Sequence, residues 1–526
     1  MTERPHIARW RDKSGLLIAA VVLTALCWIV GNPRSSGPDE PGHMIASAGL
    51  VRGDREGRTN PDPSPNMAGS HLLEVPGMVG QPDPGCWAFK PEVPVACQST
   101  VPLSTTTREL PTWSYNYPPW ALLLPGLASF VPSAGGYAYL ARMLNAVVPI
   151  ALLAGSLVAL RQRRSVLAAG ALLGVTPIAW FTFGFVSPSA VAIGGGLALW
   201  TGLLVDRSRL ATMLTVAGWT AVLLPRRDGP VWATMIVLTC ALLTMTRPLA
   251  LWRRLEPWAR WTVAAVAPLS LVTPILNRDL DSNALLPFAL LALVAAELLA
   301  RRYERTRSTT GRRALIAYTS LAAVLAAVAL VLVAPGDVHA ETVRLVVANT
   351  GDHLRQLVGI LGWLDTSVPA VAVFLFWALI GGMALVAVLD YRRSAFVYLA
   401  GLAGAVAAAW LLELGQTADY GNYWQGRYTM PFAIGLPLVL AWRPAGADWL
   451  DDRVTSIVAW GAWVVSNVAF VAAQQRWGVG VNGTWNPLDW DTWGAPVVPW
   501  MLLLVHGGAT AVLTACCTSE RVRVVA

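Results

Sequence analysis

Charged residues are scarce in this sequence, and lysine is almost absent. Only 13% of the 526 residues are charged, whereas soluble globular chains carry about a quarter. Lysine occurs only at Lys13 and Lys90, so arginine carries nearly all of the positive charge. Polar stretches long enough to form a large soluble domain are also missing. These absences exclude a soluble enzyme, and the 55% of hydrophobic residues predicts a chain embedded in a membrane throughout.

The placement of the positive charge excludes a nucleic-acid partner. Arginines gather in short loops between apolar runs, at residues 161–164, 253–254, 301–313 and 392–393. This is the positive-inside pattern of cytoplasmic loops, and it lacks a basic face interleaved with stacking aromatics. We therefore predict a multi-pass protein of the bacterial plasma membrane with cytoplasmic N- and C-termini. Arg226, Arg227 and Arg278 are exceptions, because the alternation of spans places them outside.

Cysteine is also rare, and one pair is placed for a disulfide. Four of the six lie in or beside apolar runs and are interpreted as small hydrophobic residues: Cys27, Cys240, Cys516 and Cys517. Cys86 and Cys97 share a polar loop on the predicted outer face, where an oxidising compartment permits a bridge. We expect a disulfide that contributes about 3 kcal/mol; the alternative is two unpaired thiols. No spacing predicts a metal site.

Apolar runs that can cross a hydrocarbon core of about 30 Å recur from end to end. The first follows a basic N-terminal segment and lacks a convincing cleavage site, so we interpret it as an uncleaved span. The sequence predicts an all-α polytopic protein with about fourteen transmembrane helices, at residues 15–31, 136–160, 165–183, 187–205, 210–224, 230–246, 258–275, 284–300, 314–334, 369–389, 394–412, 426–442, 454–473 and 497–515.

Several polar segments are predicted outside the membrane. Residues 32–117 form a long first extracytoplasmic loop, and residues 118–131 are apolar but short and flanked by proline, which predicts an interfacial helix. The chain divides into an N-terminal transmembrane module (1–300) and a C-terminal one (301–526). The C-terminal module adds three outer segments, at residues 336–369, 413–425 and 474–499. The first of these has apolar residues at helical spacing.

Two adjacent carboxylates follow the first span. Residues 38–43 read Pro-Asp-Glu-Pro-Gly-His, so Asp39 and Glu40 precede a proline that suits the first turn of a helix. One interpretation is a capped interfacial helix, in which the acids contribute about 0.5–1 kcal/mol through the helix dipole. The other interpretation is a general base that removes a proton from an acceptor hydroxyl.

Aromatic and basic residues recur at the same predicted face. Tyr117 precedes paired prolines, and Arg142 lies early in the second span, where an ionisable residue is a functional candidate or snorkels to the headgroups. Residues 424–428 read Trp-Gln-Gly-Arg-Tyr at the outer mouth of a late span. The guanidinium of Arg427 can hold a phosphate through two parallel hydrogen bonds, or it can anchor the helix. Asp365 precedes another span, which it could cap.

Three of these features resemble the membrane glycosyltransferases that use polyprenyl-phosphate sugars, a superfamily with the C-type fold. The features are the acidic pair Asp39-Glu40, the paired prolines at 118–119 and Arg142. Over nearly its whole length, the chain is similar to the actinobacterial membrane family of domain of unknown function 2142. That resemblance rests on six stretches in order, at residues 38–43, 117–119, 176–177, 246–249, 362–366 and 424–428.

The resemblance implies roles for individual residues. Asp39 would be the catalytic base, with Glu40 as its partner or as a metal ligand, while Arg142 and Arg427 would bind the carrier phosphate. His43 would orient an acid or contact the acceptor. The other substrate-binding candidates are Tyr117, Asp365, Trp424, Gln425 and Tyr428. One acidic pair without a second ligand set does not predict a metal, although some superfamily members need a divalent cation.

The expected reaction is transfer of a sugar from a polyprenyl-phosphate donor to an envelope glycan, lipid or protein at the extracytoplasmic face. The alternatives are a transporter or flippase of a lipid-linked saccharide and an envelope polysaccharide polymerase or ligase. No internal repeat is apparent, which disfavours the transporter. In one departure from the family, residues 185–189 read Phe-Val-Ser-Pro-Ser and lack the usual carboxamide and acid.

Overall fold

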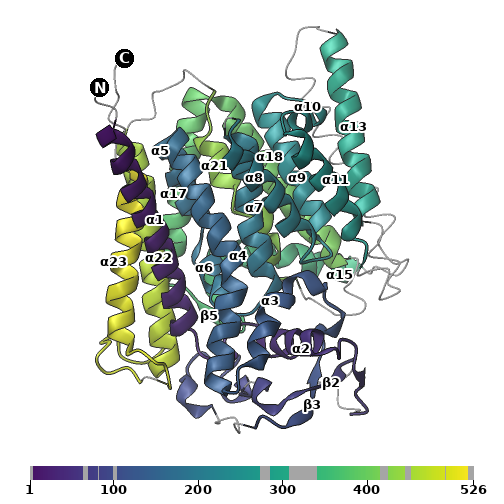
Figure 1. Cartoon of the computed structure of the whole chain (residues 1–526). Helices are drawn as coiled ribbons and strands as arrows, with labels where there is room; N and C mark the ends of the chain where they lie inside the picture. The colour runs from purple at the N-terminus through teal and green to yellow at the C-terminus, as the bar shows by residue number, and fades with distance from the viewer. Residues whose placement is uncertain are drawn as a thin grey trace.

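The computed structural model is a bundle of helices with a small mixed layer at one end. It describes residues 4–62, 69–80, 82–98, 104–205, 207–272, 285–306, 340–414, 424–444, 452–491 and 493–518. Figure 1 shows α1 (Arg4–Gly31) beginning and α23 (Pro499–Thr518) ending at the same end of the bundle. The layer with α2 (Glu40–Arg52) and strands β2 (His71–Pro76) and β3 (Thr107–Thr112) lies at the opposite end.

The remaining helices of the bundle are α3 (Leu123–Gly126), α4 (Ala134–Arg163), α5 (Ser165–Gly174), α6 (Pro177–Phe183), α7 (Pro188–Leu204), α8 (Arg209–Leu223), α9 (Gly229–Thr244), α10 (Pro248–Arg253), α11 (Pro257–Leu269), α13 (Leu285–Thr306), α15 (Ala340–Ala348), α16 (Thr350–Gly359), α17 (Ala370–Asp390), α18 (Arg392–Leu414), α20 (Gly426–Ala433), α21 (Leu436–Ala441) and α22 (Asp452–Val479). Helices α1 and α23 pack along each other, and α7 packs against both α4 and α8.

Among the described residues, six helices are long and apolar enough to cross a membrane: α1, α4, α17, α18, α22 and α23. The pair α5–α6, bent by 72°, makes a seventh if it is one span. The structure therefore supports a helical membrane protein, but not fourteen full-length spans. Helices α7, α8 and α9 are apolar yet have only 17, 15 and 16 residues, fewer than the roughly 20 that a span needs. The predicted span 314–334 lies outside the described residues, and the division into two modules stays a prediction.

The predicted span 426–442 is broken into α20 and α21 by a close helix contact. A Cβ at Gly435 would lie 2.1 Å from the ring of Trp200 in α7, and one at Gly196 would lie 1.9 Å from the carbonyl oxygen of Pro431. Backbone can approach so closely only where a side chain is absent. Trp200 Nε1 also donates a 3.0 Å hydrogen bond to the Phe432 carbonyl. These contacts fix α20, which begins one residue before Arg427.

The long loop that the sequence predicts outside the membrane is largely structured over its described residues. Strand β2 pairs antiparallel with β1 (Arg58–Thr59) and with β3, so the helical protein carries a three-stranded sheet. Side chains alternate across a strand: Leu73 and Val75 are buried, and Glu74 between them is exposed. They pack in one cluster with Met44 of α2 and Tyr137 of α4. The outer layer is thus bound to the helices by its own apolar core.

The helices predicted for residues 118–131 and for segment 336–369 are both present, but each is divided into shorter pieces. Residues 118–131 form three short helical pieces, η5 (Pro119–Ala121), α3 and η6 (Leu127–Phe130). Leu123, Leu127 and Phe130 are exposed on them. Segment 336–369 contains α15 and α16, followed by the small hairpin β4 (Ile360–Leu361) and β5 (Thr366–Ser367). The helical prediction for that segment is confirmed, whereas most of 413–425 lies outside the described residues.

The predicted disulfide between Cys86 and Cys97 is present and closes a loop of the outer layer. Arg476 of α22 clamps this loop by donating to three of its backbone carbonyls, those of Val93 (2.6 Å), Trp87 (3.0 Å) and Lys90 (3.1 Å). Since Arg476 is fully buried, its charged hydrogen bonds join the disulfide-closed loop to the bundle.

We predict that Cys86→Ala lowers the free energy of unfolding by about 2–3 kcal/mol, because the unfolded chain loses a closed loop. Thermal unfolding of the purified protein in detergent measures the change. The double variant Cys86→Ala/Cys97→Ala should match the single one, and a reductant should affect only the wild type. Equal stability of wild type and variant would contradict a structural role for the bridge.

Candidate functional site

The acidic pair divides between two different environments. Helix α2 begins at Glu40, with Pro41 in its first turn as expected. Asp39 occupies the position before the helix in a left-handed conformation (φ 66°), and its side chain makes no capping hydrogen bond. Such a backbone costs a non-glycine residue about 1–2 kcal/mol. The turn directs the two neighbouring carboxylates apart: Glu40 is fully buried, whereas the Asp39 side chain is 47% exposed.

Glu40 and Arg142 are paired with each other inside the protein. Arg142 donates two parallel hydrogen bonds to Glu40, of 2.7 and 2.8 Å. Its other N–H groups donate to the carbonyls of Ile29, Asn32 and Pro33 at the end of α1. All five donors of a guanidinium are therefore used. The pair joins α1, α2 and α4, and it has no donor left for a phosphate.

Arg427 is the partner of Asp39. Its Nη2 donates to the Asp39 carboxylate at 2.9 Å and lies 3.3 Å from the Tyr428 hydroxyl. The guanidinium is only 5% exposed, and its Nε is buried without a hydrogen-bond partner among the described residues. Arg427 thus joins the exposed carboxylate while keeping one N–H group free for a ligand.

A cavity lies beside this pair. Its lining combines Arg427, Gln425 and Gln356 with apolar residues that include Pro38 and Leu364. The side-chain oxygen of Gln425 is also buried without a partner in the described part of the chain. Donor and acceptor groups that are buried but unbonded cost about 1–3 kcal/mol each. Two of them border this cavity, and buried polar groups of this kind call for an explanation such as a bound ion, a water or a catalytic role.

The backbone around Arg427 is fixed by its neighbours. Gly426 N donates a 2.6 Å bond to the side chain of Gln356, and a Cβ on Gly426 would lie 2.6 Å from that side chain. Trp424 is buried and donates through Nε1 to Thr429 at 3.1 Å. Trp424 and Gly426 therefore act as supports that hold the guanidinium in place.

A second arginine, which the sequence did not single out as a site residue, borders the same cluster. The Arg226 guanidinium lies 4.1 Å from the centre of the Tyr428 ring, and that of Arg427 lies 5.1 Å from it. Arg226 is held by Asp228 at 2.9 Å and by Ser189 at 3.1 Å. The sequence did carry one signal for Arg226, because it was an exception to the predicted positive-inside pattern, and an arginine that breaks this pattern needs another reason for its position.

His43 and Tyr117 complete the cluster as neutral groups. Their rings meet edge-on with centroids 4.8 Å apart. Burial lowers the pKa of His43 to about 4, with Arg427 and Arg226 adding to the effect and Asp39 opposing it. Burial also raises the pKa of Tyr117 above its usual value. At neutral pH the imidazole and the phenol are therefore uncharged.

Asp365 lies away from the cavity and anchors the disulfide loop. It accepts hydrogen bonds from Phe89 N at 2.9 Å, from Thr366 at 2.8 Å and from Arg476 at 3.4 Å. Its side chain is 3% exposed. The structure thus brings Asp39, His43, Tyr117, Gln425, Arg427 and Tyr428 together at one place, whereas Glu40, Arg142, Asp365 and Trp424 support the surrounding backbone.

The family model of predicted membrane proteins named DUF2142 matches residues 22–436. The chain belongs to this family. The matched region contains every residue of the cluster around Asp39 and Arg427 but ends before α22 and α23. No curated protein and no solved structure matches the chain significantly.

We predict that Arg142→Met lowers the free energy of unfolding by about 3–5 kcal/mol, because it leaves the Glu40 carboxylate buried and unpaired. Denaturant unfolding in detergent measures this loss. The double variant Glu40→Met/Arg142→Met removes both charges and should recover most of the stability. A double variant as unstable as the sum of the two single variants would contradict the pairing.

A second prediction concerns acid. The unfolded chain protonates His43 near pH 6.5, whereas the folded protein does so only near pH 4. Between these values the unfolded state binds more protons, so stability falls as the pH falls. The loss from His43 is about 3 kcal/mol when the pH reaches 4. In His43→Gln the stability measured at pH 7 and at pH 4 should differ by correspondingly less; an unchanged difference would contradict a neutral His43.

Proposed function

We propose that this protein is a membrane glycosyltransferase that uses a polyprenyl-phosphate sugar at the extracytoplasmic face of an actinobacterial membrane. The proposal includes membership of the C-type superfamily. The observation that carries it is the contact between Arg427, a buried guanidinium with a free Nε, and Asp39, a half-exposed carboxylate. An anion site and a general base stand side by side at one cavity.

Asp39 acts on the acceptor. Its carboxylate accepts the proton of an acceptor hydroxyl as that oxygen bonds to the anomeric carbon of the donor sugar. The bond between the anomeric carbon and the carrier phosphate oxygen breaks in the same reaction. The electron pair of that bond leaves with the phosphate, and Arg427 stabilises the negative charge. The sugar is thus transferred to the acceptor oxygen, and the proton of the acceptor hydroxyl is transferred to Asp39.

Binding of the polyprenyl-phosphate sugar would also affect the hydrogen bond between Asp39 and Arg427. A phosphate that binds to Arg427 competes with Asp39 for the same Nη2 atom. A phosphate bound there would therefore release the carboxylate oxygen that Arg427 now holds, and that oxygen could accept a hydrogen bond from the acceptor hydroxyl.

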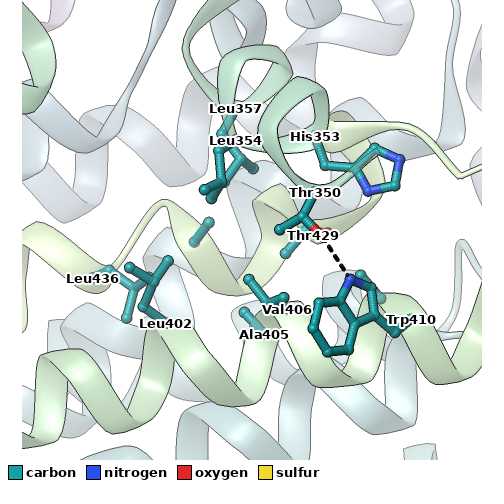
Figure 2. Close-up of a pocket in the computed structure, with 12 residues that line it drawn as sticks. Thr350, His353, Leu354, Leu357, Leu402, Ala405, Val406, Trp410, Thr429 and Leu436 are labelled. Carbon is teal, nitrogen blue, oxygen red and sulfur yellow. Dashed lines mark hydrogen bonds between the residues drawn. The ribbon is translucent and has the colours of Figure 1, made fainter. Parts of the chain in front are cut away.

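An apolar groove next to the site suits the lipid tail of the carrier. It lies between α16, α18 and α20 and is lined by Leu354, Leu357, Leu402, Ala405, Val406 and Leu436, among others. Figure 2 shows these side chains around the groove and Trp410, whose Nε1 donates to Thr350. An adjoining cavity shares Leu357, Leu402 and Leu436 with it. Thr429 of the groove lies two residues beyond Arg427 on α20, so a phosphate and its hydrocarbon chain would bind to the same helix.

We predict opposite effects for the two central residues. Arg427→Ala should weaken binding of citronellyl phosphate about 10- to 100-fold, since it removes a charge-assisted hydrogen bond of about 1.5–3 kcal/mol. Asp39→Asn should bind this probe as tightly as the wild type or more tightly, while sugar transfer in membranes is abolished. Calorimetry measures the first property, and incorporation of labelled sugar from polyprenyl-phosphate donors measures the second.

Arg355→Ala is the matched control, because Arg355 is an exposed arginine of α16 paired with Asp352. Its binding and transfer should equal those of the wild type. Wild-type transfer by Asp39→Asn would refute the assignment of the base. Vesicle assays that show lipid-linked saccharide crossing the bilayer without any transfer would favour the flippase instead.

A further inference from the structure

Two exposed apolar side chains lie on two segments that meet beside the cavity. Phe89 of the disulfide loop is 70% exposed, and Leu364 of the β4–β5 hairpin is 38% exposed. Leu364 lines the cavity together with Arg427. The ring of Phe89 meets that of Trp363 edge-on, with centroids 5.9 Å apart. We call Phe89, Trp363 and Leu364 the aromatic rim.

The aromatic rim is held in an unfavourable backbone conformation. Phe89 has φ 61° and Leu364 has φ 62°, in the left-handed region that side chains rarely adopt. The conformation is maintained by hydrogen bonds from Phe89 N to Asp365 (2.9 Å) and from Trp363 Nε1 to the Ser35 carbonyl (2.8 Å). Glycine would fit Phe89's backbone at lower cost. An exposed ring also adds little apolar burial, so stability does not account for phenylalanine at this position.

The surroundings of Phe89 determine what can bind there. Its loop carries the exposed charged residues Asp83, Lys90 and Glu92. A charged loop is too costly to place in hydrocarbon, so the open face of Phe89 lies outside the hydrocarbon core, where ligands from water can reach it. A ligand from water that covers an aromatic ring must itself have an apolar face. A sugar ring has one, formed by its C–H groups, together with hydroxyls at its edge.

We propose that the aromatic rim is the acceptor subsite and binds an uncharged saccharide by stacking on Phe89. This inference rests on the proposed glycosyl transfer and adds the chemical class of the acceptor. Pro38, the neighbour of Asp39, lines the same cavity as Leu364. A glycan that stacks on Phe89 and extends past Leu364 reaches the cavity in which Arg427 would hold the donor phosphate.

The test uses the full-length protein in detergent and two probes. The first is a set of unlabelled tetrasaccharides of mannose, galactose and arabinose, whose binding is measured by saturation-transfer NMR. The second is citronellyl phosphate. We expect Phe89→Gly to weaken saccharide binding at least 10-fold, to leave binding of citronellyl phosphate unchanged, and to melt no lower than the wild type because the backbone strain is relieved.

Phe374→Ala is the control, since Phe374 is a 75% exposed phenylalanine on α17, and it should bind both probes normally. If the wild type binds citronellyl phosphate but no tetrasaccharide, or if Phe89→Gly binds saccharide as the wild type does, the acceptor subsite is refuted and the donor site stands. If the wild type binds neither probe, the proposed glycosyl transfer fails, and the subsite fails with it.

Discussion

The buried ion pair between Glu40 and Arg142 is the constraint on which the end of the molecule that carries α2 and the sheet depends. Removing two charges from water costs several kcal/mol per ion, and only full hydrogen bonding can offset that cost. Here every N–H group of Arg142 is hydrogen-bonded. The groups that do not bind Glu40 donate to the carbonyls of Ile29, Asn32 and Pro33 at the end of α1. The pair therefore sets the direction in which the chain leaves the first span and enters α2.

The same constraint determines where the neighbouring carboxylate lies. With Glu40 fixed inside, the chain reaches α2 through a left-handed residue, and Asp39 turns outward to Arg427. The two adjacent acids thus differ in burial and in hydrogen bonding. Glu40 is buried and paired with Arg142. Asp39 is half exposed and bonded through one oxygen to Arg427, whose Nε has no partner among the described residues. Glu40 therefore stabilises the fold, and Asp39 is the carboxylate that stays accessible to a ligand.

The sequence predicted the class of the protein, because it follows from local composition. Apolar length, the proline at the start of α2 and the cysteine pair in a polar loop are readable from a few neighbouring residues. The number of spans could not be predicted from the sequence, because an apolar run does not reveal whether the chain bends. The chain bends by 72° between α5 and α6.

Contacts between residues that are far apart in the sequence could not be predicted either. Nothing near Asp365 indicates that Arg476 will bind it, and nothing near Arg142 indicates that Glu40 and three backbone carbonyls will use all of its donors. Arg226 gave a signal only as an exception to the charge pattern, and its neighbours in space come from other helices. The sequence therefore predicted which residue types gather at the site, but not which of them are free to act.

The two residues at the centre of the site are 388 positions apart in the chain. A ribosome adds about 5–20 residues per second, so Asp39 emerges tens of seconds before Arg427 is made. The first span and the outer layer can fold during that interval, but the carboxylate then faces no cation. The site comes into existence only once most of the chain has been inserted, so an incomplete chain carries no assembled site in the membrane.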